Sequence, residues 1–355
     1  MNPVYLDYAA TAPIDPTAIT AMTAAAANWA NPSSVHGFGR RTHALLEEAR
    51  TNVAVSLGCN PQSVVFTGGG TEAIGLALAQ GGRRFVSAVE HDAVRAQAPG
   101  AGVIPVDDRG VVRLDALADM LHGVERPLVA VMHVNNETGV IQPVAEVAAL
   151  VAARGGRLLV DAVQSAGKLP LPDADFVAVS AHKLGGPPGV GALIVRDHVT
   201  ATTKGGGQER GQRAGTENLP GIAGFAAALV ARAADTGWLT RCEQLRDRLE
   251  AQVPGAVIYG AGAPRVAISY VGLAGVAAMT QLMALDLAGF AVSAGAACSS
   301  GKVKASHVLG AMGAGAGAAG EAIRVSLGWQ TTAEEIDAFA AAWRAMAARL
   351  GRAAA

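Results

Sequence analysis

Short apolar runs alternate with helical patterns along most of this chain, and the alternation limits the folds that it can adopt. The runs have the length and the Val, Leu and Phe content of strands, and helical patterns separate several of them. They are SVVF, FVSAV, LVAVMHV, RLLVD, DFVAVS and GALIV, from residue 63 to residue 195. This order predicts an α/β fold, with a mostly parallel sheet covered by helices on both faces.

The pattern changes near Trp238, where a charged helical stretch, CEQLRDRLEAQV, begins. A strand, a helix, a further strand and an Ala-rich amphipathic helix follow it. The chain has 355 residues, of which 51% are apolar, and this is enough for one large core and a smaller one. We predict a large domain of residues 15–237, and a smaller α+β domain that combines residues 1–14 with 238–355.

The charge balance argues against two classes of partner. Lys and Arg number 28 against 29 Asp and Glu, and no basic run is present, so we expect neither nucleic acid nor a membrane surface as a partner. Residues 266–285 carry no charge and have the length of a membrane span, but Ser269, Tyr270 and Gln281 favour a buried strand and helix. No basic residue precedes Arg40, so we expect no signal or transit peptide.

Three cysteines are present, Cys59, Cys242 and Cys298, and none forms a CxxC pair. An odd number without pairing motifs suits a reducing compartment better than a disulfide framework. We therefore expect a cytoplasmic protein.

The candidate chemical groups follow the predicted strands, where α/β sheets usually hold their ligands. TGGGTE, at 67–72, lies between a strand and a helix, so its glycines and the helix N-terminus suit a phosphate group. A plain tight turn is the alternative. The motif lacks the spacing of dinucleotide-binding and P-loop sequences, which excludes those two sites.

Two further groups stand after strands. Asp161 ends RLLVD, where its carboxylate could pair with a protonated ring nitrogen or cap a helix. Ser180-Ala181-His182-Lys183 follows DFVAV. A lysine there can form a Schiff base with an aldehyde cofactor whose phosphate Ser180 and His182 hold, or it can simply point into water.

The motifs taken together resemble one family. In order they are TGGGTEA, EHDAV, HVNNETGVIQP, VDAVQSAGK, SAHKLGGPPGVGAL, GGGQERGQRAGTEN and SAGAACSS. This set is similar to the cysteine desulfurases of the class V aminotransferase superfamily, in the nitrogen-fixation and iron-sulfur-assembly branch. The resemblance extends from YLDYAATAPIDP to IRVSLGWQTTAEEID. It implies a fold-type I homodimer that uses pyridoxal phosphate to convert L-cysteine to L-alanine, and that passes sulfur to an acceptor or scaffold protein of iron-sulfur cluster assembly.

The same resemblance implies roles for the cofactor-binding residues. Lys183 matches the Schiff-base lysine, which also moves protons, and Asp161 matches the residue that keeps the pyridine nitrogen protonated. His91 would stack on the ring, whereas an ordinary surface histidine is the alternative. Gln164 would bind the phenolic oxygen. The phosphate would be held by Gly70, Thr71, Ser180 and His182, and by Thr216 of the second subunit.

Substrate-binding residues follow from the same match. Asn136 and Arg324 correspond to residues that hold the amino acid's carboxylate, a task that suits a guanidinium because it bonds both oxygens. A structural ion pair is the alternative for Arg324. Asn31, in NPSS, matches a further active-site contact and is the weaker candidate, because a turn or a helix cap explains it nearly as well.

Cys298 distinguishes a desulfurase from an aminotransferase, because sulfur transfer needs a thiolate. The resemblance makes it the residue that holds the persulfide, with Lys302, Lys304 and His307 nearby to lower its pKa or accept its proton. A buried, inert cysteine is the alternative, and Cys59 and Cys242 keep that assignment. No metal site is predicted, apart from Cys298 as a candidate transient ligand of an iron-sulfur cluster.

Two other functions stay open at this point. Selenocysteine cleavage, or another lyase or transamination reaction of the same superfamily, would use the same residues. A non-catalytic scaffold would keep the fold without the chemistry, and the set of Lys183, His91, Asp161 and Cys298 opposes it. The motifs depart from the family at Gly70, which replaces Ala, and at Ala181 and Ala296, which replace Gly and Ser.

Overall fold

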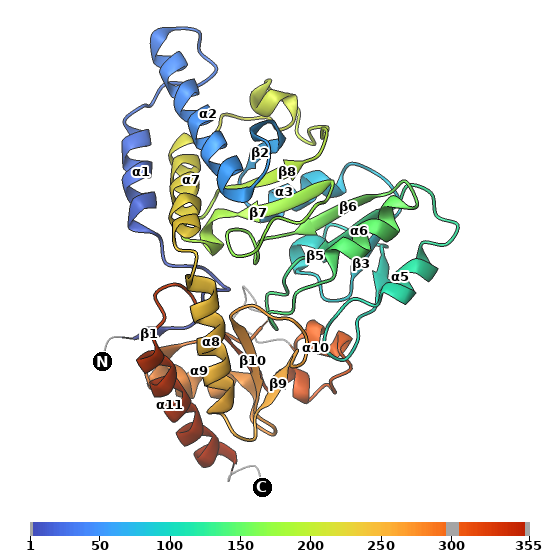
Figure 1. The fold of residues 1–355 in the computed structure, drawn as a ribbon, viewed down its shortest axis with the longest axis vertical. Helices are drawn as coiled ribbons and strands as arrows, with labels where there is room; N and C mark the ends of the chain where they lie inside the picture. The colour runs from blue at the N-terminus through green and yellow to red at the C-terminus, as the bar shows by residue number, and fades with distance from the viewer. Residues whose placement is uncertain (1–2, 296–304, 352–355) are drawn as a thin grey trace.

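The computed structural model describes residues 3–295 and 305–351, and its largest element is a seven-stranded sheet (Figure 1). The strand order is β2-β8-β7-β6-β5-β3-β4. Only β8 runs against its neighbours, β7 and β2, and the remaining pairs are parallel. The predicted, mostly parallel α/β sheet is therefore confirmed. Its strands are β2 (Val64–Thr67), β3 (Arg84–Ser87), β4 (Gly102–Ile104), β5 (Leu128–Met132), β6 (Arg157–Asp161), β7 (Phe176–Ser180) and β8 (Gly191–Val195).

Helices cover both faces of this sheet because its strands are apolar on both sides. In β5, Val129 and Val131 belong to one core cluster and Leu128 and Ala130 to another, as the two-residue period of a strand requires. The first face packs against α1 (Pro16–Ala26), α2 (Gly37–Leu57), α5 (Leu114–Met120), α6 (Val144–Ala152) and α7 (Leu219–Ala234), and the second against α3 (Gly70–Leu78) and α4 (Asp92–Arg95).

A second core lies below the large sheet in Figure 1. Its antiparallel sheet has β10 (Ile268–Gly272) between β9 (Val257–Tyr259) and β12 (Ala322–Ser326). Buried Leu285, Phe339 and Trp343 pack against that sheet. The helices of this part are α8 (Trp238–Ala251), α9 (Ala278–Leu287) and α11 (Ala333–Gly351), whereas the buried side chains of α10 (His307–Ala311) join the core of the large sheet.

The start of the chain joins this lower part, because β1 (Val4–Tyr5) pairs in parallel with β11 (Phe290–Ala291). The domain boundaries given above stay a prediction. The uncharged stretch 266–285 is divided between β10 and α9. Within the described ranges, every helix is too short or too polar to cross a bilayer.

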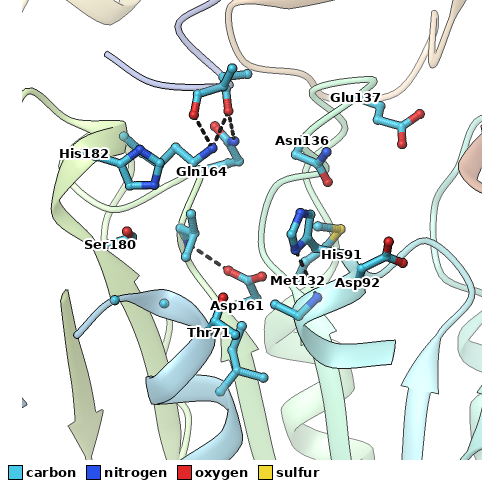
Figure 2. A pocket seen from close by; sticks show the side chains of 18 of the residues that line it. Thr71, His91, Asp92, Met132, Asn136, Glu137, Asp161, Gln164, Ser180 and His182 are labelled. Carbon is cyan, nitrogen blue, oxygen red and sulfur yellow. Dashed lines mark hydrogen bonds between the residues drawn. The ribbon is translucent and has the colours of Figure 1, made fainter. Parts of the chain in front are cut away.

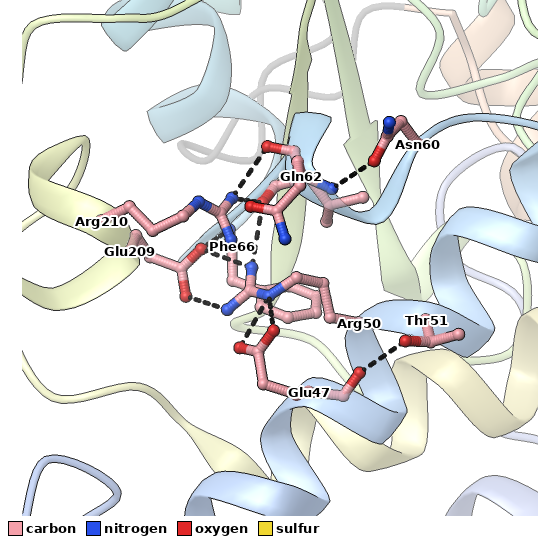
Figure 3. A network of polar contacts seen from close by, with 9 residues as sticks. Glu47, Arg50, Thr51, Asn60, Gln62, Phe66, Glu209 and Arg210 are labelled. Atoms are coloured by element: carbon pink, nitrogen blue, oxygen red, sulfur yellow. Dashed lines mark hydrogen bonds and ion pairs between the residues drawn. The ribbon is translucent and has the colours of Figure 1, made fainter.

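A buried ion pair fixes the loop that precedes α7 (Figure 3). The two guanidinium nitrogens of Arg50, on α2, donate to the two carboxylate oxygens of Glu209 at 2.8 and 2.9 Å. The Phe66 amide also donates to Glu209, at 2.8 Å. Glu209 and Arg210 have backbone φ angles of 47° and 57°, which residues other than glycine rarely adopt. The ion pair therefore helps to hold a strained turn.

Candidate active site

Parallel strands end at one edge of the large sheet and bring the predicted site residues together there (Figure 2). They come from the ends of β6 and β7, from the segments that follow β2, β3, β5, β6 and β7, and from β12, and they surround a cavity of about 670 Å³. The predicted residues that line this cavity are Gly70, Thr71, His91, Asn136, Asp161, Gln164, Ser180, His182, Lys183 and Arg324.

Lys183 lies in a 3-10 turn that directly follows β7. Its Nζ donates to the carbonyl oxygens of Ala9 and Ala10, both at 2.7 Å. Burial lowers the pKa of Lys183 to about 8, with a further contribution from the positive charge of Arg324. A depressed pKa increases the neutral, nucleophilic fraction of the amine near neutral pH.

Asp161 and Gln164 line the cavity, and the described residues use only part of the hydrogen-bonding capacity of these two side chains. Asp161 is 6% exposed, and burial raises the pKa of its carboxyl group. One of its oxygens accepts from the Val163 amide at 2.9 Å, a local turn contact. The Gln164 amide nitrogen donates to Ala9, whereas its Oε1 is buried with no partner in the described part of the chain. Burying an ionised carboxylate and an unpaired amide oxygen costs free energy. A cation beside Asp161 and a hydrogen-bond donor beside Gln164 would offset these two costs.

The N-terminus of α3 faces the same cavity. Gly69 precedes it with a φ of 146° and no side-chain cap, so the first amides of the helix are free to bind an anion. A Cβ on Gly70 would lie 2.7 Å from Val163 Cγ2, and this contact explains the glycine that replaces the family's alanine. Nearby, burial lowers the pKa of His182 to about 4, so this side chain is neutral.

His91 caps the short helix α4, and its Nδ1 accepts from the Ala93 amide at 3.1 Å. Nε2 therefore carries the hydrogen in the neutral ring. The neighbouring Glu90 is fully buried, and it accepts from the Ser87 hydroxyl at 2.5 Å and from the Met132 amide at 2.7 Å. Burial raises the pKa of Glu90 to about 8. These hydrogen bonds fix the residue before His91, and so help to hold His91 at the cavity wall.

Arg324 extends from β12 into the opposite wall. Its guanidinium donates to the Asn136 carbonyl and to the Asp7 carboxylate, each at 2.9 Å, while its Nε is buried without a partner among the described residues. The ion-pair alternative is thus present, with Asp7 as the partner. Arg324 also lines the cavity, so the same side chain can meet an anionic ligand.

Two predicted residues lie outside this cavity wall. Asn31 is exposed, and its side chain accepts from the Ser33 amide at 2.9 Å, which is the turn contact considered as its alternative. Thr216 is also exposed, in the loop before α7. Neither residue is among those that line the cavity.

Cys298 lies outside the described residues, as do Ala296, Lys302 and Lys304, so their roles stay predictions. His307 is described and lines the cavity. Burial raises the pKa of both Cys59 and Cys242 to about 11, which favours the inert thiol at these two positions. In the ranges 3–295 and 305–351, no three His, Cys, Asp or Glu side chains gather as a metal site.

Three contributions to the site were not predicted: the Asp7 carboxylate, the carbonyl groups of Ala9 and Ala10, and the Glu137 carboxylate. All of them belong to motifs already quoted, YLDYAAT and NNETG. Their position in these motifs was the available signal. Their partners, however, are more than 150 residues away in sequence.

Comparisons with known proteins agree on one family. The Aminotransferase class-V profile matches residues 4–339. An IscS-like cysteine desulfurase of Mycobacterium tuberculosis is 38% identical, over 94% of this chain and 93% of its own length, and a cysteine desulfurase of Cereibacter sphaeroides is 41% identical, over 95% and 94%. The solved structure of a NifS-like protein from Rickettsia africae has a TM-score of 0.90 at 32% identity, and covers 97% of this chain and 99% of its own.

Proposed function

Because the chain belongs to the class-V aminotransferase family and is a cysteine desulfurase within it, we propose that it removes sulfur from free L-cysteine, holds it as a persulfide on Cys298 and releases L-alanine. One observation carries the proposal. A lysine with a depressed pKa, a buried carboxylate and a histidine of fixed tautomer line the same cavity. This combination suits proton transfer beside a cationic ring.

We propose pyridoxal phosphate as the cofactor. When bound, it supplies an electron-withdrawing ring that makes the substrate's Cα proton acidic. Lys183 would hold its aldehyde carbon, Asp161 would keep a proton on its ring nitrogen, and Gln164 would bind its phenolic oxygen. The unpartnered Gln164 Oε1 can accept from the phenolic hydroxyl, and a cationic ring nitrogen would offset the burial that raises the pKa of Asp161. The phosphate would be held by Gly70, Thr71, Ser180 and His182 at the uncapped end of α3.

The remaining residues would bind the substrate and move protons. Arg324 and Asn136 would hold the carboxylate of L-cysteine, with Arg324 leaving Asp7 to do so. Lys183 would take the Cα proton and later return one. In the sulfur transfer, the Cys298 thiolate attacks the substrate sulfur, an S–S bond forms and the Cβ–S bond breaks. The electron pair of that bond stays on carbon, which is then protonated to give alanine.

We further propose a homodimer. Trp29, Val35 and Phe38 are 82%, 87% and 59% exposed, and the Trp29 and Phe38 rings stack with centroids 6.0 Å apart. These apolar side chains flank Asn31 and are costly to leave in water. A second copy would cover them, and it would allow Thr216 to reach the phosphate of the partner's site.

The persulfide would pass to an acceptor or scaffold protein of iron-sulfur cluster assembly, with Cys298 as a transient cluster ligand. The free thiols of Cys59 and Cys242 support a reducing compartment, the cytoplasm.

The test is product formation from L-cysteine with pyridoxal phosphate and a reductant. The wild type should release sulfide and alanine in equal amounts. C298A should keep the cofactor's absorbance and release neither, whereas C59A should match the wild type. Wild type that binds the cofactor and makes neither product would contradict the assignment, and turnover of selenocysteine alone would replace it.

A further inference from the structure

Arg324, the residue expected to bind the substrate's carboxylate, is paired in the structure with a carboxylate of this chain. Its guanidinium donates to Asp7 Oδ1 and to the Asn136 carbonyl, each at 2.9 Å. The Arg324 side chain is 4% exposed, so its charge is removed from water and needs a partner. Asp7 is that partner, and it makes the kind of contact that the carboxylate of an amino acid would make.

The hold of Asp7 on the guanidinium is incomplete. Arg324 and Asn136 line the cavity whereas Asp7 is not among the lining residues, so Asp7 holds Arg324 from outside the cavity. Nε of Arg324 is buried without a partner among the described residues, and it is an unused donor. One buried positive charge does not balance two carboxylates, so Asp7 and the carboxylate of a ligand would compete for it.

The backbone around Asp7 is fixed to β12, the strand that carries Arg324. Asp7 forms a parallel bridge with Ser326, whose hydroxyl accepts from the Ala9 amide at 2.9 Å. The Ser326 amide donates to the Leu6 carbonyl at 2.8 Å. These contacts leave the side chain as the part of Asp7 that can move.

The surroundings of the two side chains favour such a movement. The Asp7 side chain is 18% exposed, against 4% for Arg324. Rotation about the side-chain bonds of Asp7 can therefore release the guanidinium and expose the carboxylate to water, where it is solvated. Arg324 has no such access to water, so it depends on a partner in either state.

The exchange of one carboxylate for another preserves the charge near Lys183. Burial is the main cause of the lowered pKa of Lys183, the positive charge of Arg324 adds to it, and the Asp7 carboxylate opposes it. Both members of the ion pair thus act on the amine. A ligand carboxylate that replaces Asp7 at Arg324 brings the same negative charge to the same guanidinium.

We propose that Asp7 is an internal competitor for the substrate's carboxylate: it leaves Arg324 when an amino acid binds and returns to it as the product departs. The identity of these ligands, L-cysteine and L-alanine, rests on the proposed function. Because a ligand must displace Asp7, its apparent affinity is lower than it would be for a free Arg324. Asp7 therefore affects affinity and product release, and it takes no part in breaking the Cβ–S bond.

The experiment measures ligand binding by calorimetry on the full, cofactor-loaded protein, with L-alanine as the probe. For D7N, which keeps the size of the side chain, we expect a Kd at least about 5-fold lower than that of wild type. D7S, with a shorter side chain, should bind L-alanine at least as tightly as D7N. D108N makes the same charge change at an exposed position and should equal wild type.

A matched ligand identifies the group with which Asp7 competes. Ethylamine is L-alanine without its carboxylate, so its affinity should not increase in D7N. In an R324Q background, D7N should give no gain for L-alanine, because the two residues act on one contact. In turnover, D7N should lower KM for L-cysteine and should be inhibited more strongly by added L-alanine.

An unchanged affinity for L-alanine in D7N would overturn the proposal. A weaker affinity would also overturn it, and would mean that Asp7 orients Arg324 for the ligand. An equal gain for ethylamine would do the same, because the effect would then not concern the carboxylate. If D7N binds L-alanine more tightly than wild type does but neither protein turns over L-cysteine, the proposed function fails and the role of Asp7 stands.

Discussion

Two buried polar regions of this protein differ in how completely their groups are paired. In the first, Arg50 and Glu209 share two hydrogen bonds, and Glu209 also accepts from the Phe66 amide (Figure 3). Burial alone would lower the pKa of Arg50, but the bonds to Glu209 outweigh it and the pKa is raised. This ion pair is satisfied without any ligand.

In the active-site cavity, by contrast, the buried polar groups are incompletely paired. Asp161 has a raised pKa, Lys183 has a lowered one, and Gln164 Oε1 and Arg324 Nε have no partner in the described chain. The same kinds of side chain are buried in both places, so burial does not explain the difference. Paired groups hold the fold, whereas groups left unpaired at a stability cost are available to a cofactor and a substrate. Four measurements can break or sharpen this contrast.

The largest effect is expected from K183A. Removal of the amine that would hold the cofactor and move the Cα proton should lower kcat/KM for L-cysteine by about 10⁴-fold. K204A, at an exposed lysine, should leave the rate unchanged. A loss of less than 10-fold in K183A would show that another group provides the chemistry.

The next effect concerns stability. E209A leaves Arg50 buried without its partner, so the free energy of unfolding should fall by about 3–5 kcal/mol in denaturant titrations. E125A removes an exposed carboxylate and should change it by less than about 0.5 kcal/mol. An E209A protein as stable as wild type would show that this pair is not structural.

D161N, unlike E209A, should lower activity without lowering stability. Activity should fall by about 10²-fold, because the amide cannot keep the ring nitrogen protonated. The unfolding free energy of the cofactor-free protein should not decrease, because the buried carboxylate is bonded there only to the Val163 amide. A large loss of stability in D161N would place Asp161 with Glu209 instead.

The fourth effect depends on pH. In the folded protein the pKa of Lys183 is about 8, against an ordinary 10.5, so the unfolded chain binds more protons between these values. The resulting penalty is fully present below about pH 8 and is relieved toward about pH 10.5, so the free energy of unfolding rises with pH in this window. The stability difference between K183M and cofactor-free wild type should therefore shrink by about 3 kcal/mol. The same comparison with K204M is the control. A stability difference between K183M and wild type that stays constant with pH would refute the lowered pKa of Lys183.

Most of the site was predictable because its residues follow strands whose pattern is local. The apolar runs that end in Asp161 and Ser180 identify buried strands, and parallel strands place their carboxyl ends at one edge. The motif resemblance then supplied the roles. For Asn31 and Thr216, which a single chain leaves outside the cavity wall, the assigned roles stay predictions.

The sequence by itself determined the parallel α/β sheet, its order of chemical groups and the family, since these depend on periodicity and on motifs of neighbouring residues. Tertiary structure alone decided which groups are paired. Asp7 meets Arg324, Glu137 meets Gly295 and Ser306, and Val163 fills the space beside Gly70. Such contacts join distant parts of the chain, and the pKa values of Lys183 and Asp161 follow from burial, which no local pattern specifies.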